Sequence, residues 1–346
     1  MSGGGPTVPL ILGAGGMLGA AVARVLEKEF PGTVSATRAE ADVTDRFRLE
    51  AEVERLRPTV IVNCAAYTDV DGCELDADRA RRVNAEGAEN TALAAAAAGC
   101  RLVHISTDFV FDGRSRRPYL ESDPTGPLSQ YGRTKLEGER RVAAAHPDPL
   151  IVRTSWLYGH GRSNFVDAIR TRARDGGILK VVDDQFGSPT YVADLAEALP
   201  LLLAIERRGL VHFANAGHCS RHDLASAVVT ILGAPCRLER ITTEEAGRIA
   251  VRRPQRDDRR RVDDPGEARR LGGAQHGRQP PDVHPVEVAR VPDPGAHQRR
   301  HVDEGVAPLQ GTPHRRRLQE VAAHRAAPGG EPALAPGSRQ DQHAVP

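Results

Sequence analysis

Short apolar runs alternate with longer amphipathic or alanine-rich stretches between Val8 and about Ile249. This rhythm is typical of β-α-β units, in which helices connect the strands of a parallel sheet. Because helices cover both faces of such a sheet, its strands are nearly continuous apolar runs. Four runs predict strands of this kind: Val8–Leu12, Thr59–Asn63, Arg101–Ser106 and Leu150–Thr154.

The stretches between these runs predict helices. The clearest are Leu18–Phe30, Asp76–Ala98 and Gln130–Ala145. A further short strand is expected to end near Val34 to Thr37. The pattern therefore predicts an α/β fold of the Rossmann type, a doubly wound parallel sheet with helices on both faces.

The texture of the chain changes after Pro254. Residues 255–346 contain no Phe, Tyr, Trp, Ile, Met, Cys, Lys or Asn, and Arg, Pro, Gly, His and Asp recur without a helical or strand period. Such a segment cannot bury a core, so we expect it to be disordered. A basic RNA-binding arm is the alternative, although aspartates and glutamates dilute its arginines.

Composition limits the classes of function. The 346 residues suffice for an enzyme with a sizeable core, and a formal net charge of +1 gives no global attraction to nucleic acid or an anionic membrane. The five cysteines form no Cys-x-x-Cys pair, which indicates reduced thiols. The start of the chain has no secretory signal pattern and no apolar run reaches membrane-spanning length. We therefore expect a cytoplasmic protein.

Three residues predict a proton-transfer site. Tyr131 and Lys135 are four positions apart in a predicted helix, so the phenol and the ammonium share one helix face. A nearby positive charge lowers the pKa of a tyrosine from its usual value of about 10, so we expect Lys135 to make Tyr131 a proton donor and acceptor near neutral pH. Thr107, at the end of the strand that starts at Arg101, completes this trio.

The first strand runs directly into a glycine-rich loop and then a helix. The loop contains Gly13, Gly15, Gly16 and Gly19. Early glycines in this position allow a tight turn and close approach of a pyrophosphate to the helix N-terminus, and the last one allows the helix to pack on the strand. The strand-loop-helix context makes this a dinucleotide-binding prediction.

Three other segments are expected near the dinucleotide. At the end of the second strand, where an acidic residue would select NAD, the chain has Thr37-Arg38. Arginine suits a 2′-phosphate, so we expect NADPH, with NADH left open. Asp42-Val43 can lie against the adenine, and the small residues of Cys64 to Thr68 allow the cofactor to pass the third strand end.

The assembled motifs resemble those of the extended short-chain dehydrogenase/reductase superfamily and, within it, the dTDP-4-dehydrorhamnose reductase family. The resemblance extends over residues 8–254. The segments that carry it are residues 63–71 (NCAAYTDVD), 106–113 (STDFVFDG), 129–138 (SQYGRTKLEG), 153–159 (RTSWLYG) and 184–190 (DQFGSPT).

The resemblance implies reduction of the C4 ketone of dTDP-4-dehydro-L-rhamnose by NAD(P)H, in dTDP-rhamnose biosynthesis. It gives Tyr131 the role of proton donor, Lys135 that of tuning the tyrosine and binding the nicotinamide ribose, and Thr107 a hydrogen bond to the substrate carbonyl. It also implies a nucleotide-sugar partner and leaves a homodimer open.

The remaining family positions divide between cofactor and substrate. Those expected at the cofactor are Gly16, Met17, Leu18, Asp42, Val43, Ala65, Ala66, Tyr67 and Thr68, together with Tyr131 and Lys135 of the trio. Those expected at the substrate are Asp108 and Trp156, with Asn164, Gln185 and Thr190 lining the sugar-nucleotide pocket. Residues 1–152 form the expected NAD(P)-binding domain, and residues 153–254 form a smaller substrate-binding lobe with elements that can return to the sheet.

The chain departs from the family in two places. Some relatives bind magnesium through acidic residues that include one early in the first helix, where this chain has Ala20-Ala21, so we predict no such metal site. The family also continues past an Arg-Pro dipeptide into a terminal helix, whereas Arg253-Pro254 precedes the arginine-rich tail. We hypothesise a reading-frame shift, which translation of the other frames tests.

Three alternative functions follow from the same fold. A sugar-nucleotide 4,6-dehydratase or epimerase shares the Tyr/Lys pair, but a dehydratase typically has Asp-Glu after the threonine, where this chain has Asp108-Phe109. The regulatory subunit of methionine adenosyltransferase resembles this family and acts by binding a partner. A catalytically inactive product of the altered C-terminus is the third.

Overall fold

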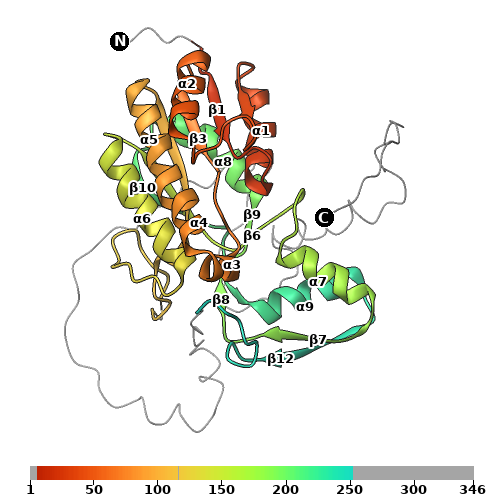
Figure 1. The fold of residues 1–346 in the computed structure, drawn as a ribbon. Helices are drawn as coiled ribbons and strands as arrows, with labels where there is room; N and C mark the ends of the chain where they lie inside the picture. Colours follow the sequence, from red (N-terminus) through yellow and green to blue (C-terminus); the bar gives the residue numbers. More distant parts are fainter. Residues whose placement is uncertain (1–5, 116, 252–346) are drawn as a thin grey trace, which may run out of the picture.

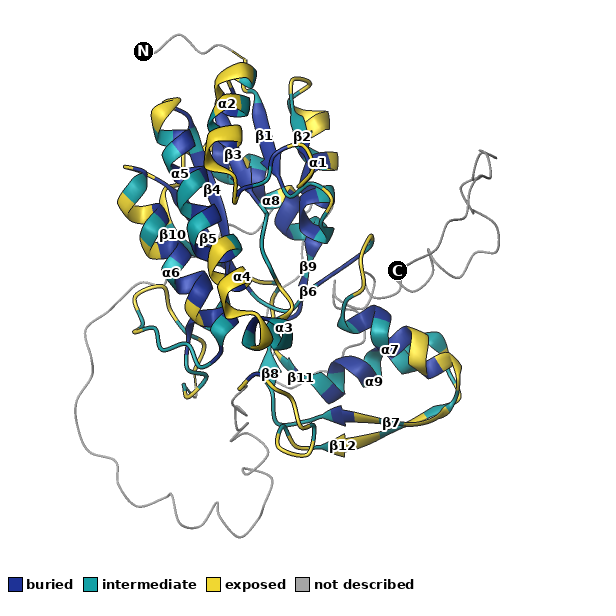
Figure 2. Ribbon diagram, in the orientation of Figure 1, coloured by how far each residue is buried: buried dark blue, intermediate teal, exposed yellow. Residues whose placement is uncertain are grey.

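A computed structural model of the chain describes residues 6–115 and 117–251. Its centre is a parallel sheet of six strands in the order β2-β1-β3-β4-β5-β10 (Figures 1 and 2). The chain moves from β1 outward to β2 and returns to the other side of β1 at β3, which makes the β1/β3 boundary a topological switch point. The strands are β1 Pro9–Leu12, β2 Val34–Ala36, β3 Val60–Asn63, β4 Arg101–Thr107, β5 Leu150–Thr154 and β10 Gly209–Phe213.

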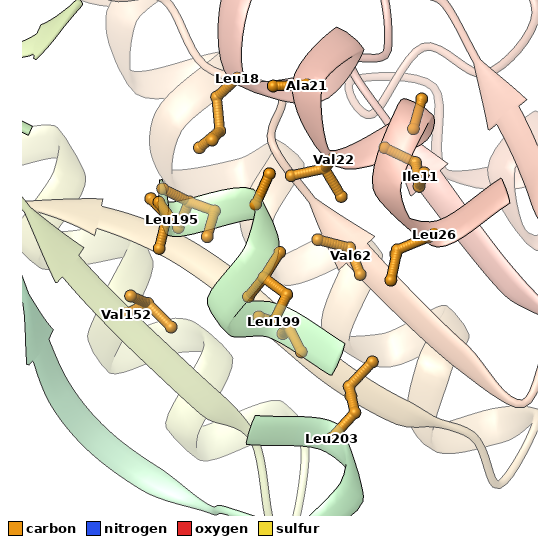
Figure 3. Packing of buried hydrophobic residues seen from close by; sticks show 14 of the residues in the cluster. Ile11, Leu18, Ala21, Val22, Leu26, Val62, Val152, Leu195, Leu199 and Leu203 are labelled. Carbon is orange, nitrogen blue, oxygen red and sulfur yellow. The ribbon is translucent and has the colours of Figure 1, made fainter. Parts of the chain in front are cut away.

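Successive residues of the strands are buried on opposite faces of the sheet. Ile11 of β1 packs in one apolar cluster, whereas Leu10 and Leu12 pack in another. Helices α1 (Met17–Glu29) and α8 (Val192–Ala204) cover the first face, as the close-up of this cluster shows (Figure 3). The opposite face is covered by α2 (Arg46–Leu56), α5 (Gly87–Ala97) and α6 (Gln130–Ala145). The sheet is therefore buried on both sides (Figure 2), which confirms the predicted doubly wound α/β class.

The predicted elements agree with the structure at most boundaries. Helix α6 has the predicted bounds, and the four predicted strands are β1, β3, β4 and β5. The helix predicted over residues 76–98 is instead broken into α4 (Ala77–Arg81), a π-helical turn η1 (Arg82–Glu86) and α5. A π-helical turn inserts a residue into the helical repeat and is frequent at functional sites.

The segment after residue 152 contributes to both parts of the molecule. Strand β10 pairs with β5 in parallel and forms the sheet edge, and α8 packs on α1. The remaining elements form a separate small lobe (Figure 1), in which β7 (Gly177–Val182) pairs in parallel with β12 (Cys236–Ile241). Helices α7 (Phe165–Arg174) and α9 (Arg221–Leu232) pack with this pair around a third apolar cluster.

Short elements lie where the sheet meets the lobe (Figure 1). A 3-10 turn η2 (Asp108–Val110) follows β4 directly, and helix α3 (Val70–Leu75) follows the β3 loop. Two strand pairs lie at the junction: β6 (Leu157–Tyr158) with β9 (Thr190–Tyr191), and β8 (Phe186–Gly187) with β11 (Cys219–Ser220). Because β5 continues into β6 across Ser155 and Trp156, the residues that follow the C-terminal end of β5 lie between the sheet and the lobe.

The tail expected to be disordered, residues 255–346, lies outside the described residues, as does the predicted site of the frame shift. In the described part, no helix combines the length and the apolar character needed to cross a membrane.

Candidate active site

The loop between β1 and α1 has the backbone required for a bound diphosphate. Gly13 has a φ of +76°, and a Cβ there would lie 2.7 Å from Ala65 N. A Cβ on Gly19 would lie 2.2 Å from the carbonyl oxygen of Gly13, so α1 can pack on the loop only with glycine at this position. Gly15 is exposed, and no side chain caps the first turn of α1 at Met17. The backbone amide groups of this loop and of the first turn of α1 therefore fit the diphosphate of a dinucleotide.

Arg38 and Asp42 lie together beyond the C-terminal end of β2. Arg38 Nε is 2.9 Å from Asp42 Oδ2, and the arginine side chain is 72% exposed. Asp42 also accepts a hydrogen bond of 2.9 Å from Thr44 N. The adenosine end of a dinucleotide falls at this position in the doubly wound fold. An exposed guanidinium at this position fits a 2′-phosphate. The phosphate would compete with the Asp42 carboxylate for the guanidinium of Arg38.

The loop after β3 is held by a residue that sequence reasoning did not single out. Asn84, in the η1 turn, is 1% exposed and accepts a 2.8 Å hydrogen bond from Tyr67 N while donating one of 3.0 Å to Tyr67 O. It also contacts Thr134 of α6 at 3.2 Å. Asn84 therefore connects two elements: the loop that contains Ala65, Ala66 and Thr68, and the helix that carries Tyr131. The sequence gives little signal for it, because it stands in an otherwise ordinary helical stretch.

Lys135 is buried and held by the neighbouring strand. Its side chain is 2% exposed, and Nζ donates a 2.6 Å hydrogen bond to the carbonyl oxygen of Ile105 on β4. His104 Nε2 lies 3.5 Å from the same nitrogen. Burial lowers the pKa of Lys135 to about 8, against the opposing effect of the charge of Glu139. The ammonium therefore loses its proton much more easily than an ordinary lysine.

Tyr131 is buried beside Thr107, and its phenol differs from the expectation. Burial raises the pKa of Tyr131 above its usual range; a hydrogen bond with Thr107 opposes this shift, and the charge of Asp108 adds to it. The expectation that Lys135 lowers this pKa does not hold, because burial dominates and the ammonium is bonded to Ile105. A phenol with a raised pKa keeps its proton through the neutral range, which suits a proton donor to a more basic alkoxide.

A pocket of about 120 Å³ lies between the end of the sheet and the small lobe. Phe109 lines it and packs edge-on against Tyr131, with ring centroids 5.4 Å apart. The position at which a dehydratase would carry a glutamate is therefore apolar. The lining residues come from both parts of the chain: Asp108, Phe109, Phe111, Asp112, Gly113, Tyr119, Leu128, Ser129, Trp156, Gln185, Phe186, Arg221 and Val251.

Asp108 is a pocket carboxyl with an altered pKa. Burial raises the pKa of Asp108 to about 6, while the hydrogen bond from Thr107 and the charge of Arg221 act in the opposite direction. Thr107 Oγ1 donates to Asp108 Oδ1 at 3.1 Å. The carboxyl group therefore changes charge in the mildly acidic range, next to the proposed proton donor.

Trp156 lines the pocket in a strained backbone conformation. Its φ of +46° falls in the left-handed region, which non-glycine residues rarely adopt. A Cβ on Gly187 would lie 2.5 Å from Trp156 Cε2, so the indole packs directly against the β8 backbone. The guanidinium carbon of Arg221 lies 3.5 Å from the centre of the indole ring. Backbone strain maintained by close packing at a pocket indicates a functional position.

Of the other residues expected at the substrate, the structure places Gln185 in the pocket lining but not Asn164 or Thr190. Gln185 lines the pocket and donates a 3.0 Å hydrogen bond to Thr243. Asn164 caps α7 and lies 3.6 Å from the sulfur of Met17, beside the glycine-rich loop and outside the pocket lining. Thr190 is fully buried at the start of β9 and is also not among the lining residues of this pocket in the described chain.

Arg221 is a charged pocket residue that sequence reasoning missed. Ser220 and Asp223 form a capping box that a sequence pattern can reveal, and it fixes the start of α9. The pattern cannot show that the first residue of this helix meets Trp156, because the two are brought together only by the fold.

Among the residues that the structure describes, one group of acidic and histidine side chains occurs apart from this pocket, in the lobe. Ligand atoms of Asp183, His222 and Asp223 lie within 4.8 Å of one another. Asp183 accepts hydrogen bonds from Ser220 at 2.8 Å and Arg240 at 2.5 Å, so protein donors already occupy its carboxylate. The absence of a metal near Ala20 stays a prediction.

The doubly wound fold and the trio of Thr107, Tyr131 and Lys135 define a class of protein, the extended short-chain dehydrogenases/reductases. Residues 8–258 match the family described as RmlD substrate binding domain. The chain is 44% identical over 250 residues to the dTDP-4-dehydrorhamnose reductase of Mycobacterium tuberculosis, which covers 70% of this chain and 82% of that protein. The chain belongs to the dTDP-4-dehydrorhamnose reductase family.

Two other relatives are informative. The dTDP-4-keto-6-deoxy-D-glucose reductase of Streptomyces niveus is 43% identical over 226 residues, which is 65% of this chain and 78% of that protein. A solved structure of dTDP-4-dehydrorhamnose reductase from Bacillus anthracis in complex with NADP has a TM-score of 0.70 and 36% identity, covering 72% of this chain and 89% of that chain.

Proposed function

We propose that the chain reduces dTDP-4-dehydro-L-rhamnose to dTDP-L-rhamnose with NADPH, in the biosynthesis of dTDP-rhamnose. The observation that carries this proposal is the joint burial of Thr107, at the end of β4, and of Tyr131 and Lys135, four positions apart on α6. Phe109, which packs on Tyr131, lines the adjacent pocket. The family membership and the names of the relatives support the substrate.

The roles of the trio follow from their contacts. When the ketone carbon at C4 gains a hydride, its oxygen becomes an alkoxide that needs a proton. Tyr131 donates this proton, because its raised pKa keeps the phenol protonated until a stronger base arrives. Thr107 orients the carbonyl oxygen beside the phenol. Lys135, whose Nζ is held by the Ile105 carbonyl oxygen, would bind the nicotinamide ribose.

NADPH supplies the hydride. The residues that would hold it are those of the glycine-rich loop from Gly13 to Gly19, Arg38 with Asp42 and Val43, and the small residues Ala65 to Thr68. Leu18 and Val43 are 7% and 4% exposed, so their backbone atoms, not their side chains, are the expected contacts. Arg38 supports NADPH over NADH, and the NADP complex of the relative from Bacillus anthracis supports the same choice.

The pocket supports a nucleotide sugar. Asp108, Trp156 and Gln185 of the residues expected at the substrate line one cavity with Arg221. A second candidate is reduction of another dTDP-4-keto-6-deoxyhexose, since a relative named for such a substrate is 43% identical. A dehydratase is disfavoured, because Phe109 packs on Tyr131 where an acidic residue would be needed.

The experiment compares two ketones under the same conditions. NADPH oxidation is followed with dTDP-4-dehydro-L-rhamnose and with dTDP-4-keto-6-deoxy-D-glucose, and the products are identified by NMR. We expect kcat/KM to be higher for the first ketone, with dTDP-L-rhamnose as its product. A higher kcat/KM for the second would establish the alternative, and a lack of NADPH oxidation with either would exclude both reductase activities.

We further propose a cytoplasmic enzyme. All five cysteines are free thiols, which agrees with a reducing compartment. Sedimentation equilibrium distinguishes a homodimer from a monomer. We propose that residues 1–152, with α8 and β10, bind the cofactor and that the remaining lobe binds the substrate.

A further inference from the structure

Arg221 occupies a defined position in the pocket. It is the first residue of α9, is half-buried, and its backbone N–H donates a 3.1 Å hydrogen bond to Gln185 O. Its guanidinium carbon lies 3.5 Å from the centre of the Trp156 ring and 5.0 Å from that of Phe165. Two aromatic rings and a capped helix start therefore restrain this side chain, which lowers the entropy lost when it binds a ligand.

The charge of the pocket lining is otherwise negative. Its ionised groups are Asp108, Asp112 and Arg221, and Arg221 is the basic residue among the described lining side chains. Asp112 accepts a 2.7 Å hydrogen bond from Tyr119, and the charge of Arg221 lowers the pKa of Asp108. A nucleoside diphosphate that enters this pocket brings two further negative charges, which need a cation within it.

We propose that Arg221 binds the diphosphate of the nucleotide-sugar substrate and so selects a nucleoside diphosphate sugar over other ketones. This inference rests on the proposed function for the identity of the nucleotide. A guanidinium in contact with a ring uses its face for the ring, and its N–H groups lie in its plane. They form paired, charge-assisted hydrogen bonds with phosphate oxygens, a geometry that lysine cannot reproduce. Trp156, against the backbone of Gly187, supports the guanidinium in this orientation.

The test measures binding without turnover. The affinities of dTDP and thymidine are determined by calorimetry with saturating NADPH, for the full chain and for Arg221→Gln, Arg221→Lys and Arg237→Gln. Arg237 is an exposed arginine of β12 in the same lobe, so its variant controls for the lost charge. The ratio of the thymidine Kd to the dTDP Kd isolates the diphosphate contribution within each variant.

We expect this ratio to fall about 10- to 100-fold in Arg221→Gln, as loss of a charge-assisted hydrogen bond implies. Arg221→Lys should recover part of it, Arg237→Gln should match the unmodified chain, and thymidine and NADPH affinities should change little. With the sugar substrate, KM should rise in Arg221→Gln while kcat changes less.

An unchanged ratio in Arg221→Gln would overturn the proposal, as would failure of the unmodified chain to bind dTDP. If the chain binds dTDP in an Arg221-dependent way but oxidises no NADPH with either ketone, the proposed reaction fails and the role of Arg221 stands. A melting curve for each variant shows that the protein is folded, and Arg221→Lys provides the comparison if Arg221→Gln does not fold.

Discussion

Lys135 donates a hydrogen bond of 2.6 Å to the carbonyl oxygen of Ile105, on the strand that leads to Thr107. This contact connects the two parts of the proposed catalytic trio: the helix that carries Tyr131 and the strand end that carries Thr107. It also fixes a buried ammonium whose pKa is lowered to about 8 by burial. The Ile105 carbonyl thus fixes the position of Lys135, whereas burial sets its pKa, and the two effects can be tested separately.

The lowered pKa of Lys135 predicts an alkaline limit to activity. As the pH rises through about 8, the ammonium loses its proton, and the positive charge that we propose lies beside the cofactor disappears. We expect kcat to fall above this pH. Lys135→Arg keeps its charge to much higher pH, so its alkaline limit should move upward even if its maximum kcat is lower. The measurement is the pH profile of kcat for both proteins; the same alkaline limit in both would contradict the assignment.

Asp108 predicts a pH-dependent stability. Its folded-state pKa of about 6 lies above the ordinary value of 3.8, so the folded state disfavours its carboxylate. This destabilisation is absent when the carboxyl is protonated in both states, develops as the pH rises from about 4 to 6, and persists above. Asp108→Asn should therefore raise the unfolding free energy at neutral pH and lose this gain in acid. Denaturant unfolding across pH measures it, with exposed Glu54→Gln as the control; a gain independent of pH would exclude this cause.

Arg38 predicts a cofactor-specific effect. Its side chain is exposed and paired with Asp42, so its removal should leave the fold intact. Arg38→Ala should raise the KM for NADPH about 10-fold, the effect of one charge-assisted hydrogen bond, and change the KM for NADH little. The matched control is Arg46→Ala, an arginine of α2 that pairs with Glu50. Equal changes for the two cofactors would place the 2′-phosphate elsewhere.

Gly187 predicts a coupled loss of stability and substrate binding. A Cβ at this position would lie 2.5 Å from the Trp156 indole, so Gly187→Ala must displace the ring or the β8 backbone. We expect a loss of about 1–3 kcal/mol in unfolding free energy and a raised KM for the sugar, with the KM for NADPH unchanged. Gly32→Ala, whose Cβ would make ordinary contact at 3.5 Å, is the control. Normal stability in Gly187→Ala would show that the indole is not packed as described.

The elements that sequence patterns predict are those whose pattern is local. The near-continuous apolar strands β1, β3, β4 and β5 and the amphipathic α6 were predicted within a few residues. Strand β10 was not specifically predicted, because Gly209–Phe213 is a five-residue edge strand whose pairing with β5 depends on the fold. The π-helical turn at Asn84 was also missed, because it depends on the contacts of Asn84 with Tyr67 and Thr134.

The active-site residues show the same difference between what is local in the sequence and what depends on the fold. The spacing of Tyr131 and Lys135 predicted a shared helix face, and both side chains are buried beside β4. Their pKa values were not predictable, because burial is a property of the folded chain and outweighs the charge of the neighbour. Arg221 is 65 positions from Trp156 in the sequence, and only the packing of the lobe brings the two together.

The most direct measurement is the rate of NADPH oxidation with dTDP-4-dehydro-L-rhamnose in the unmodified chain and in Tyr131→Phe. The phenylalanine ring preserves the edge-on contact with Phe109 and removes the hydroxyl that meets Thr107. We predict substrate-dependent oxidation in the unmodified chain and a loss of kcat of about 10²- to 10⁴-fold in the variant, with unchanged NADPH affinity. Undiminished turnover in Tyr131→Phe would contradict the account.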